Sequence, residues 1–239
     1  MEGYVHSIET CGTLDGPGIR YVIFLQGCPL RCKFCHNPDS WQINAGRKVS
    51  VDELMEDILR YRNYIKTGGV TLSGGEPLLQ AKFAAELFRE CKRHGIHTAV
   101  DTSGAIALSI CKEAVDAVDL VLLDIKSIDT IKCADLTGKG NEDALTLLNY
   151  LEQTGKDVWI RHVVVPGITE NEEDIERMAQ YLSRFTVIKR VEILPFHKMG
   201  EYKWKQLNLN YELGDTQPPE KESIENIKNI LRKYRLNVV

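Results

Sequence analysis

The stretch GCPLRCKFCHN, residues 27–37, carries three of the seven cysteines of this chain. Three residues separate Cys28 from Cys32, and two separate Cys32 from Cys35. Cysteines clustered in this way in a reducing compartment more often bind metal or do redox chemistry than form disulfides. The remaining cysteines are isolated and are expected to be structural: Cys11, and Cys91, Cys111 and Cys133, which fall in or near predicted helices, where cysteine behaves as a small hydrophobic residue. The stretch therefore predicts a metal centre with three protein thiolates and no fourth.

Two kinds of metal centre fit three thiolates. Structural zinc usually takes four tetrahedral ligands, supplied as two pairs from separate turns. His36 directly follows Cys35 and is poorly placed to chelate the same ion, so a zinc site would need a remote histidine. An iron-sulfur cube fits better, because thiolates are its usual ligands and it carries an electron at strongly negative potential. Three thiolates leave one iron without a protein ligand, and a small molecule can bind there directly.

Composition places the metal loop in an ordinary globular chain. The 239 residues are 43% hydrophobic and 27% charged, which is enough for a full core and predicts a single domain over residues 1–239. The net charge of −4, without a long basic run, favours neither nucleic acid nor an anionic membrane as partner. The N-terminus has no basic segment followed by an apolar one, and the runs YVIFL and LVLL are too short to span a bilayer. We expect a cytoplasmic protein.

Short apolar runs alternate with helical patterns along the chain. Ser50 with Glu53, and Thr169 with Glu172, form capping boxes that predict the starts of two helices. Further helices are expected over residues 79–94, 107–116, 142–153 and 221–235. Nearly continuous hydrophobic runs, typical of parallel strands buried on both faces, cover residues 21–26, 69–72, 98–100, 120–125, 158–165 and 191–194. Six strand-helix units predict an α/β fold, either a barrel-like arc short of a complete barrel or an open sheet.

The unusual residues follow the predicted strands. The cysteine loop follows the first run, and SGGEP, DTSG, DIK, VPG and PFH follow the next five. In both candidate folds, chemistry collects at the carboxyl ends of the strands. Each feature also has a plain structural explanation. Gly74 and Gly75 would make a turn, and Glu76 would stabilise the following helix through its dipole. Asp101 would be a helix cap or a turn residue, and Asp124 and Lys126 would form a surface ion pair.

The cysteine spacing, with Phe34 just before the last cysteine and GGEP at residues 74–77, resembles the signature of radical S-adenosylmethionine (SAM) enzymes. The resemblance implies a partial (β/α)6 barrel and one 4Fe-4S cluster held by Cys28, Cys32 and Cys35. It also implies that the amino and carboxylate groups of SAM chelate the remaining iron. An electron from the cluster then splits the sulfonium into methionine and a 5′-deoxyadenosyl radical, which takes a hydrogen atom from the substrate.

The same resemblance implies which residues contact SAM. The backbone at Gly75 and the carboxylate of Glu76 hold the amino group of its methionine part, and Asp124 and Lys126 bond to the ribose region. Phe34 packs along the adenine. The complete implied set is Phe34, Cys35, His36, Gly74, Gly75, Glu76, Asp101, Thr102, Asp124, Ile125, Lys126 and His197. The assignment of His197 rests on the resemblance, because an isolated histidine is more often structural or solvated.

A monovalent cation is a further implication. Two carboxylates close to the cofactor carboxylate would repel each other strongly unless a cation lay between them. Similar enzymes place sodium or potassium among two aspartates, a threonine and a strand-end carbonyl. The matching groups in this sequence are Asp101, Thr102, Asp124 and the carbonyl of Leu122.

DGPGIR at residues 15–20 reads as a tight turn before the first strand. It also matches activating enzymes of glycyl radical enzymes, and with TLSGGEPLLQ, LLDIK, RHVVVPG and LPFHKMGEYKW the resemblance covers almost the whole chain. It is strongest to the activating enzymes of pyruvate formate-lyase. Residues 38–68 contain no cysteine, so the ferredoxin-like insert of several relatives is missing.

The implied reaction removes an α-hydrogen from a backbone glycine of pyruvate formate-lyase, with no side chain acting as general acid or base. Asp15 and Gly16 would help to position the partner's glycine loop. The resemblance further implies a flavodoxin-type or ferredoxin-type electron donor and a monomeric enzyme. Three alternatives stay open: an activase of another glycyl radical enzyme, a radical SAM enzyme acting on a small molecule, and a zinc-stabilised binding module.

Overall fold

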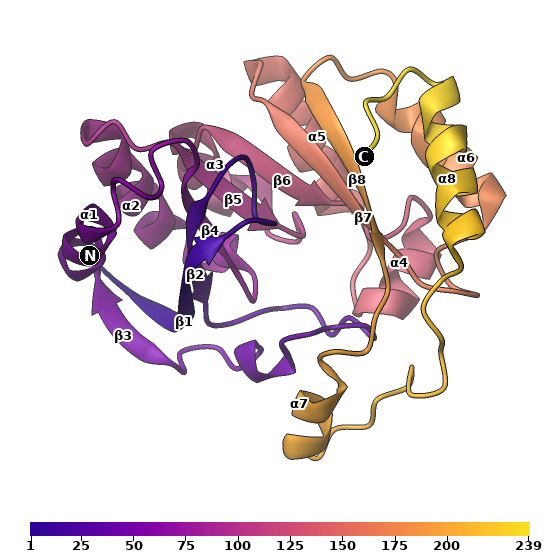
Figure 1. The fold of residues 1–239 in the computed structure, drawn as a ribbon, viewed down its shortest axis with the longest axis horizontal. Coiled ribbons are helices and arrows are strands. Elements are labelled where there is room, and N and C mark those ends of the chain that lie inside the picture. The colour runs from indigo at the N-terminus through magenta and orange to yellow at the C-terminus, as the bar shows by residue number, and fades with distance from the viewer. The chain divides into compact units, whose positions relative to one another are not determined.

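The computed structural model describes residues 1–239 and shows a mixed α/β fold (Figure 1). Its strands belong to an open sheet of eight strands. The chain forms two compact units, one made of Met1–Pro29 and Ser40–Leu122, the other of Leu30–Asp39 and Leu123–Val239. None of the helices is long and apolar enough to cross a membrane.

The first unit contains five strands in the order β3-β1-β2-β4-β5. Their bounds are Glu2–Gly12 (β1), Arg20–Leu25 (β2), Arg47–Ser50 (β3), Gly69–Gly74 (β4) and Thr98–Thr102 (β5). β1 runs antiparallel to β2 and β3, whereas β2, β4 and β5 are parallel. The sequence predicts the three parallel strands correctly, because they are almost fully buried.

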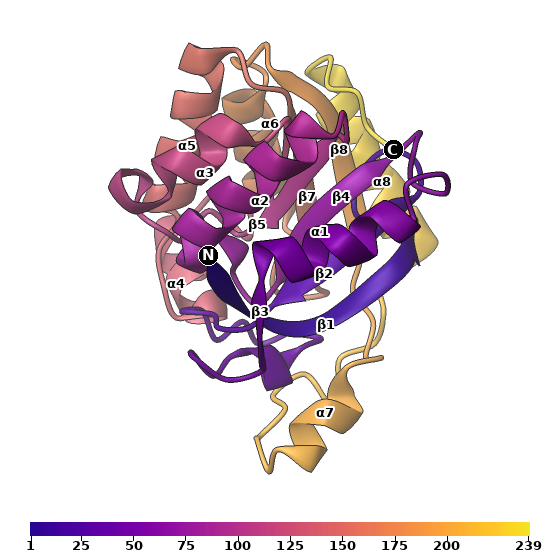
Figure 2. The same cartoon turned by 90° about the vertical axis from the view of Figure 1, so that its left-hand side faces the viewer.

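Three helices cover one face of these strands (Figures 1 and 2). They are α1 (Val51–Arg60), α2 (Ala81–Arg93) and α3 (Leu108–Ala117), with a short 3-10 helix, Pro77–Gln80, before α2. The predicted cap of α1 is confirmed, because the Ser50 side chain accepts a hydrogen bond from the Glu53 amide. The apolar stripe of α1 is buried at Val51, Leu54, Met55 and Ile58.

In the second unit, β7 (Val158–Val164) and β8 (Ile188–Pro195) pair in parallel. β6 (Leu120–Asp124) spans the boundary in the sequence, as does the 3-10 helix Pro38–Ser40. α6 and α8 lie side by side (Figure 1). The helices of this unit are α4 (Thr130–Thr137), α5 (Glu142–Thr154), α6 (Glu172–Leu182), α7 (Glu201–Gln206) and α8 (Lys221–Lys233).

One predicted helix start is wrong. The N-cap of α6 is Asn171, whose side chain accepts a hydrogen bond from the Asp174 amide. Thr169 instead belongs to the turn before the helix, where its hydroxyl donates to the Val163 carbonyl and accepts from the Val165 amide. Asparagine is as good an N-cap as threonine, so the longer turn after β7 decides which residue takes the position.

The sequence reading also missed four elements: β1, β3, α4 and α7. β1 alternates between buried and exposed residues rather than being continuously apolar, and β3 has only four residues. α4 and α7 are too short to show a helical period, with eight and six residues. The missed strands make the sheet mixed, whereas only a parallel sheet was expected.

Candidate functional site

The cysteine loop begins in the first unit. The amide of Gly27 donates to the Ser40 carbonyl at 2.7 Å, and the amide of Cys28 donates to the Trp41 carbonyl at 3.2 Å. Both bonds are between backbone groups, so they fix the course of the loop without using the thiol. Cys28 is buried, with 9% of its surface exposed.

The rest of the loop belongs to the second unit. Its backbone is anchored to α4, because the amides of Arg31 and Lys33 donate to the carbonyls of Thr137 and Leu136 at 2.7 and 3.0 Å. The Cys35 amide donates to the Cys32 carbonyl at 3.0 Å, which closes a tight turn between the two thiols. The anchoring helix is one that the sequence reading missed.

The donor chemistry of the loop fits an iron-sulfur cluster. None of the three cysteines is in a disulfide; Cys28 and Cys32 are buried and Cys35 is half-buried. Thiolates shielded from solvent are the usual ligands of such a cluster. No three histidine, cysteine, aspartate or glutamate side chains are placed to hold a metal ion in this structure, so the ligand set stays a prediction.

The segment after β8 fastens the end of the cysteine loop. The indole Nε1–H of Trp204 donates to the Cys35 carbonyl at 2.8 Å. Lys203 Nζ donates to Asn37 Oδ1 at 2.8 Å and lies 2.9 Å from Asp39 Oδ2. Sequence reasoning missed these residues, and the only signal was the KMGEYKW stretch, whose spacing carries no chemistry by itself.

Replacing Trp204 with phenylalanine tests this fastening. The change removes one donor but keeps a large ring, so we expect the free energy of unfolding to fall by about 1 kcal/mol and iron to be lost faster to a chelator. Trp159→Phe is the matched control, because Trp159 lies on β7 and its ring packs against Arg190 on β8. Equal rates of iron loss in the two variants would contradict a role for Trp204 in holding the loop.

Two predicted histidines lie against each other in the second unit. The rings of His36 and His197 stack with centroids 4.2 Å apart and planes inclined by 25°. His36 Nε2 lies 2.9 Å from the His197 carbonyl oxygen, so this nitrogen carries the hydrogen. Burial lowers the pKa of His36, and the carbonyl hydrogen bond opposes the shift. The two rings thus form a stacked pair, and the contact of His197 with the nucleoside remains a prediction.

Asp124, Lys126 and Phe34 form a second group in the same unit. Lys126 Nζ lies 2.6 Å from Asp124 Oδ2 and 5.2 Å from the centroid of the Phe34 ring. The Lys126 and Asp124 side chains are only 14% and 18% exposed, so the ion pair is more sheltered than the surface pair that was the plain alternative. The predicted aromatic and polar contacts for SAM are therefore neighbours.

Ile125 is held through its backbone. Its amide donates to the Arg161 carbonyl at 2.9 Å, and its carbonyl lies 2.7 Å from Nδ1 of the buried His162. The Arg161 side chain pairs with Glu192 at 3.4 Å. His162 was not singled out from the sequence, where it reads as a core residue of β7.

In the first unit, Gly74 and Gly75 allow β4 to end directly against β2. Gly74 has a φ of +110°, and an added Cβ would lie 2.4 Å from the Leu25 amide nitrogen. A Cβ on Gly75 would lie 2.3 Å from the Gly27 carbonyl oxygen. The amide of Glu76 donates to that same carbonyl at 2.8 Å. The glycines therefore bring the GGEP segment onto the start of the cysteine loop.

Glu76 is fully buried and its carboxylate is surrounded by donors. Oε1 accepts from the Leu78 amide at 3.0 Å and the Thr102 hydroxyl at 2.7 Å. Oε2 accepts from the amide and the hydroxyl of Ser103 at 2.9 and 2.5 Å. Burial raises the pKa of Glu76, and these hydrogen bonds oppose that rise. A bond from Glu76 to an amino group, which remains a prediction, would have to compete with two hydroxyl donors.

Asp101 and Thr102 end β5 next to this carboxylate. The Ser73 hydroxyl donates to Asp101 Oδ2 at 3.2 Å, and the Thr102 hydroxyl accepts from the Gly104 amide at 3.0 Å. Leu122, which was expected at a strand end, lies in the middle of β6 and is fully buried. A cation among these groups and Asp124 stays a prediction. Ser103 is the residue that the sequence reading missed, although it lies within the DTSG motif.

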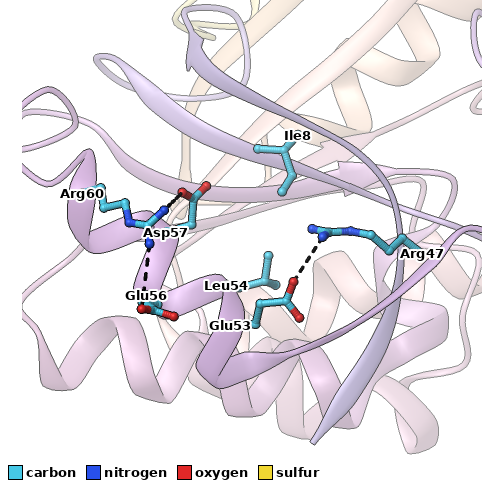
Figure 3. A pocket seen from close by; sticks show the side chains of 7 residues that line it. All are labelled: Ile8, Arg47, Glu53, Leu54, Glu56, Asp57 and Arg60. Atoms are coloured by element: carbon cyan, nitrogen blue, oxygen red, sulfur yellow. Dashed lines mark hydrogen bonds and ion pairs between the residues drawn. The ribbon is translucent and has the colours of Figure 1, made fainter.

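The pocket in Figure 3 lies elsewhere in the first unit, between α1 and β1. Arg47 pairs with Glu53 at 3.1 Å, and Arg60 pairs with Asp57 at 3.6 Å. Ile8 also lines it. None of the predicted site residues is in this pocket, so it has no part in the chemistry considered above.

Comparison with known proteins decides the family. The model of the radical SAM superfamily matches residues 22–182, which run from β2 to the end of α6. The chain belongs to the radical SAM superfamily. Members of this superfamily use a 4Fe-4S cluster and SAM, and so does this enzyme. The radical SAM fold class that the sequence predicted is confirmed as well.

Within the radical SAM superfamily, the chain is similar to activating enzymes of pyruvate formate-lyase. The chain is 44% identical over 234 residues to pyruvate formate-lyase-activating enzyme of Staphylococcus epidermidis, covering 94% of this chain and 93% of the relative. It is 40% identical over 236 residues to pyruvate formate-lyase 1-activating enzyme of Escherichia coli K12, covering 97% and 96%. The crystal structure of a domain of the Bacteroides vulgatus pyruvate-formate lyase-activating enzyme superposes with a TM-score of 0.61 at 26% identity, covering 72% of this chain and 98% of that one.

Proposed function

We propose that this radical SAM enzyme activates pyruvate formate-lyase by abstracting a hydrogen atom from one of its backbone glycines. The observation that carries the proposal is the identity of 40–44% to activating enzymes of that partner, over at least 93% of each chain. The cysteine-free segment 38–68 supports the same choice. We further propose that residues 1–239 act as a single radical SAM domain.

The residues divide the work as follows. Cys28, Cys32 and Cys35 hold the cluster, and Trp204 keeps the end of their loop in place. When bound, the cluster and SAM together supply a 5′-deoxyadenosyl radical. Gly75 and Glu76 orient the amino end of the cofactor. The remaining contacts to the cofactor or to its cation come from Phe34, His36, Gly74, Asp101, Thr102, Leu122, Asp124, Ile125, Lys126 and His197.

The hydrogen transfer needs no proton relay. When bound, the cofactor would accept the α-hydrogen atom of the partner's glycine at its 5′ carbon, so that the Cα–H bond would break homolytically and 5′-deoxyadenosine would form. The unpaired electron stays on the glycine Cα, where the flanking amide groups delocalise it. Asp15 and Gly16 contact the glycine loop of the partner. No side chain of the enzyme changes its protonation state.

The proposal also covers the compartment, the electron donor and the oligomeric state of the enzyme. The enzyme works in the cytoplasm, where its seven cysteines, none of them in a disulfide, stay reduced. A flavodoxin-type or ferredoxin-type protein supplies the electron. We propose that the enzyme is a monomer, because its substrate is itself a folded protein that needs access to the site.

A mixing experiment tests this function. Anaerobic, cluster-loaded enzyme is combined with pyruvate formate-lyase, SAM and a reductant, and electron paramagnetic resonance is recorded. We expect a glycyl radical signal on the partner that requires SAM, together with one 5′-deoxyadenosine for each radical formed.

The outcomes separate the alternatives. Cofactor cleavage without a glycyl signal would point to another glycyl radical enzyme or to a small-molecule substrate. A colourless protein with bound zinc and no 5′-deoxyadenosine would show a binding module instead. Either result would overturn the proposal.

A further inference from the structure

A buried arginine, Arg20, lies beneath the turn that contains Asp15 and Gly16 and stabilises it through hydrogen bonds. Arg20, the first residue of β2, has none of its surface exposed. Its guanidinium donates to the Gly68 carbonyl at 2.6 Å and to the Val70 carbonyl at 2.5 Å. Burial lowers the pKa of Arg20 to about 10, so the group is still charged at neutral pH.

Arg20 also sets the direction of a hydrogen-bond relay. Its Nε donates to the Thr71 hydroxyl oxygen at 2.8 Å. Because a guanidinium has only donors, that hydroxyl must accept from Arg20 and direct its single hydrogen elsewhere. The hydrogen points to the Asp15 carbonyl oxygen, at an oxygen-oxygen distance of 2.7 Å. The relay from Arg20 through Thr71 thus fixes the backbone of Asp15.

A neighbouring histidine fits the same arrangement. Nη1 of Arg20 lies 3.1 Å from Nδ1 of His97, and this nitrogen must be the acceptor, since Arg20 has no lone pair to offer. Burial and then the charge of Arg20 lower the pKa of His97, which keeps the imidazole neutral. His97 therefore completes the shell of acceptors around the guanidinium.

The backbone of the turn packs closely against the segment before β4. Gly16 and Gly18 have φ values of +124° and +69°, which side chains rarely adopt. A Cβ on Gly18 would lie 2.5 Å from the Thr67 carbonyl oxygen. Gly16 is buried and Asp15 half-buried, whereas the neighbouring Gly18 and Leu14 are exposed, Leu14 with 77% of its surface. The backbone of the turn is thus held from its buried side, and the exposed residues on either side of Asp15 and Gly16 can be reached by a partner.

We infer that Arg20 and Thr71 are positioning residues that hold the Asp15–Gly16 turn in the shape required to receive the partner's glycine segment. The inference rests on the proposed function. An extended glycine-containing backbone offers amide and carbonyl groups, and it binds best to a turn that is already ordered, because less conformational entropy is then lost on binding. Neither residue touches the partner, so their effect is on partner affinity and not on the splitting of SAM.

Thr71→Val tests the relay with almost no change in shape, and Thr71→Ser restores the hydroxyl. We expect Thr71→Val to raise the KM for pyruvate formate-lyase about tenfold, which corresponds to the loss of about one hydrogen bond. The kcat and the slow 5′-deoxyadenosine formation without partner should stay within about twofold of the unchanged protein. Hydrogen exchange of the amides in residues 13–18 should be faster in Thr71→Val than in Thr71→Ser or the unchanged protein.

Arg20→Lys gives a second measurement in case Thr71→Val lowers stability. A lysine keeps the charge but lacks the planar set of donors, so the same rise in KM is expected. Arg89→Lys is the control, because Arg89 is exposed and pairs only with Glu113 at 2.8 Å.

The possible results distinguish failure of this inference from failure of the proposed function. A KM unchanged in both Thr71→Val and Arg20→Lys, or equally raised in Thr71→Ser, would overturn the inference. If the unchanged enzyme forms no glycyl radical on pyruvate formate-lyase at all, the proposed function fails instead. Faster amide exchange in residues 13–18 without a change in KM would show that the order of the turn is irrelevant to the partner, and would also overturn the inference.

Discussion

Cys32→Ser is expected to leave the protein unable to retain its cluster or to split SAM, with a loss of at least about 100-fold in 5′-deoxyadenosine formation. A serine hydroxyl is a hard oxygen donor with a far higher pKa than a thiol, and it replaces thiolate poorly as a ligand of iron. Cys32 is buried in the tight turn that its carbonyl forms with the Cys35 amide. The geometry of that backbone turn is unaffected by the change, so the loss is one of ligand chemistry.

The measurement combines iron and sulfide content, the visible absorption of the anaerobic protein, and 5′-deoxyadenosine formation with a strong reductant. Cys11→Ser is the matched control, because Cys11 is exposed at the end of β1 and should behave like the unchanged protein. A Cys32→Ser protein that remains brown and active, or a Cys11→Ser protein that loses its iron, would remove the cysteine loop as the site of the cluster.

Sequence reasoning succeeds here where chemistry and hydrophobic pattern are local. The spacing of the cysteines, the GGEP turn and the buried parallel strands all depend on residues a few positions apart, and local spacing can be read directly. The cap of α1 is another example, since Ser50 and Glu53 lie within one helical turn.

The sequence reading fails where a contact joins distant parts of the chain. Trp204 and Cys35 are 169 positions apart, and nothing in either segment indicates that an indole donates to that carbonyl. Ser103 likewise binds Glu76 from 27 positions away. The fold creates both contacts: the first needs the segment after β8 to reach the cysteine loop, and the second needs β4 and β5 to be paired.

The burial of Arg20 also depends on distant residues and could not be predicted from the sequence. An arginine at the start of an apolar strand would ordinarily be taken as a solvated strand end, because arginine is rarely buried unless it is paired. Its burial is tolerated because three carbonyl or hydroxyl oxygens from neighbouring segments accept its hydrogens. Those acceptors lie about fifty positions away in sequence, at Gly68, Val70 and Thr71.

Gly75→Ala is expected to lower the free energy of unfolding by about 3 kcal/mol and to weaken SAM binding. Gly75 does not have a positive φ, so alanine brings no backbone strain of its own. The cost is steric, because the new Cβ would lie 2.3 Å from the Gly27 carbonyl oxygen and 3.1 Å from that of Ser40. Both neighbours are backbone atoms of the segments that flank the cysteine loop.

Relief of this collision requires the end of β4 to move away from the start of the cysteine loop. The movement would stretch the bond from the Glu76 amide to the Gly27 carbonyl, now 2.8 Å. It would also shift the buried Glu76 carboxylate relative to its donors Thr102 and Ser103. The loss of stability and the loss of cofactor affinity should therefore appear together.

Gly155→Ala is the control variant for Gly75→Ala, because it adds the same methyl group without a steric collision. Gly155 ends α5 with a φ of +66° and has nothing within 4 Å of an added Cβ, so it isolates the conformational cost, about 1 kcal/mol. Urea unfolding and SAM binding of the two variants, measured without oxygen, separate the two effects. If Gly75→Ala costs no more than Gly155→Ala and leaves SAM affinity unchanged, then Gly75 is only a turn residue, and the close approach of the GGEP segment to the cysteine loop has no bearing on cofactor binding.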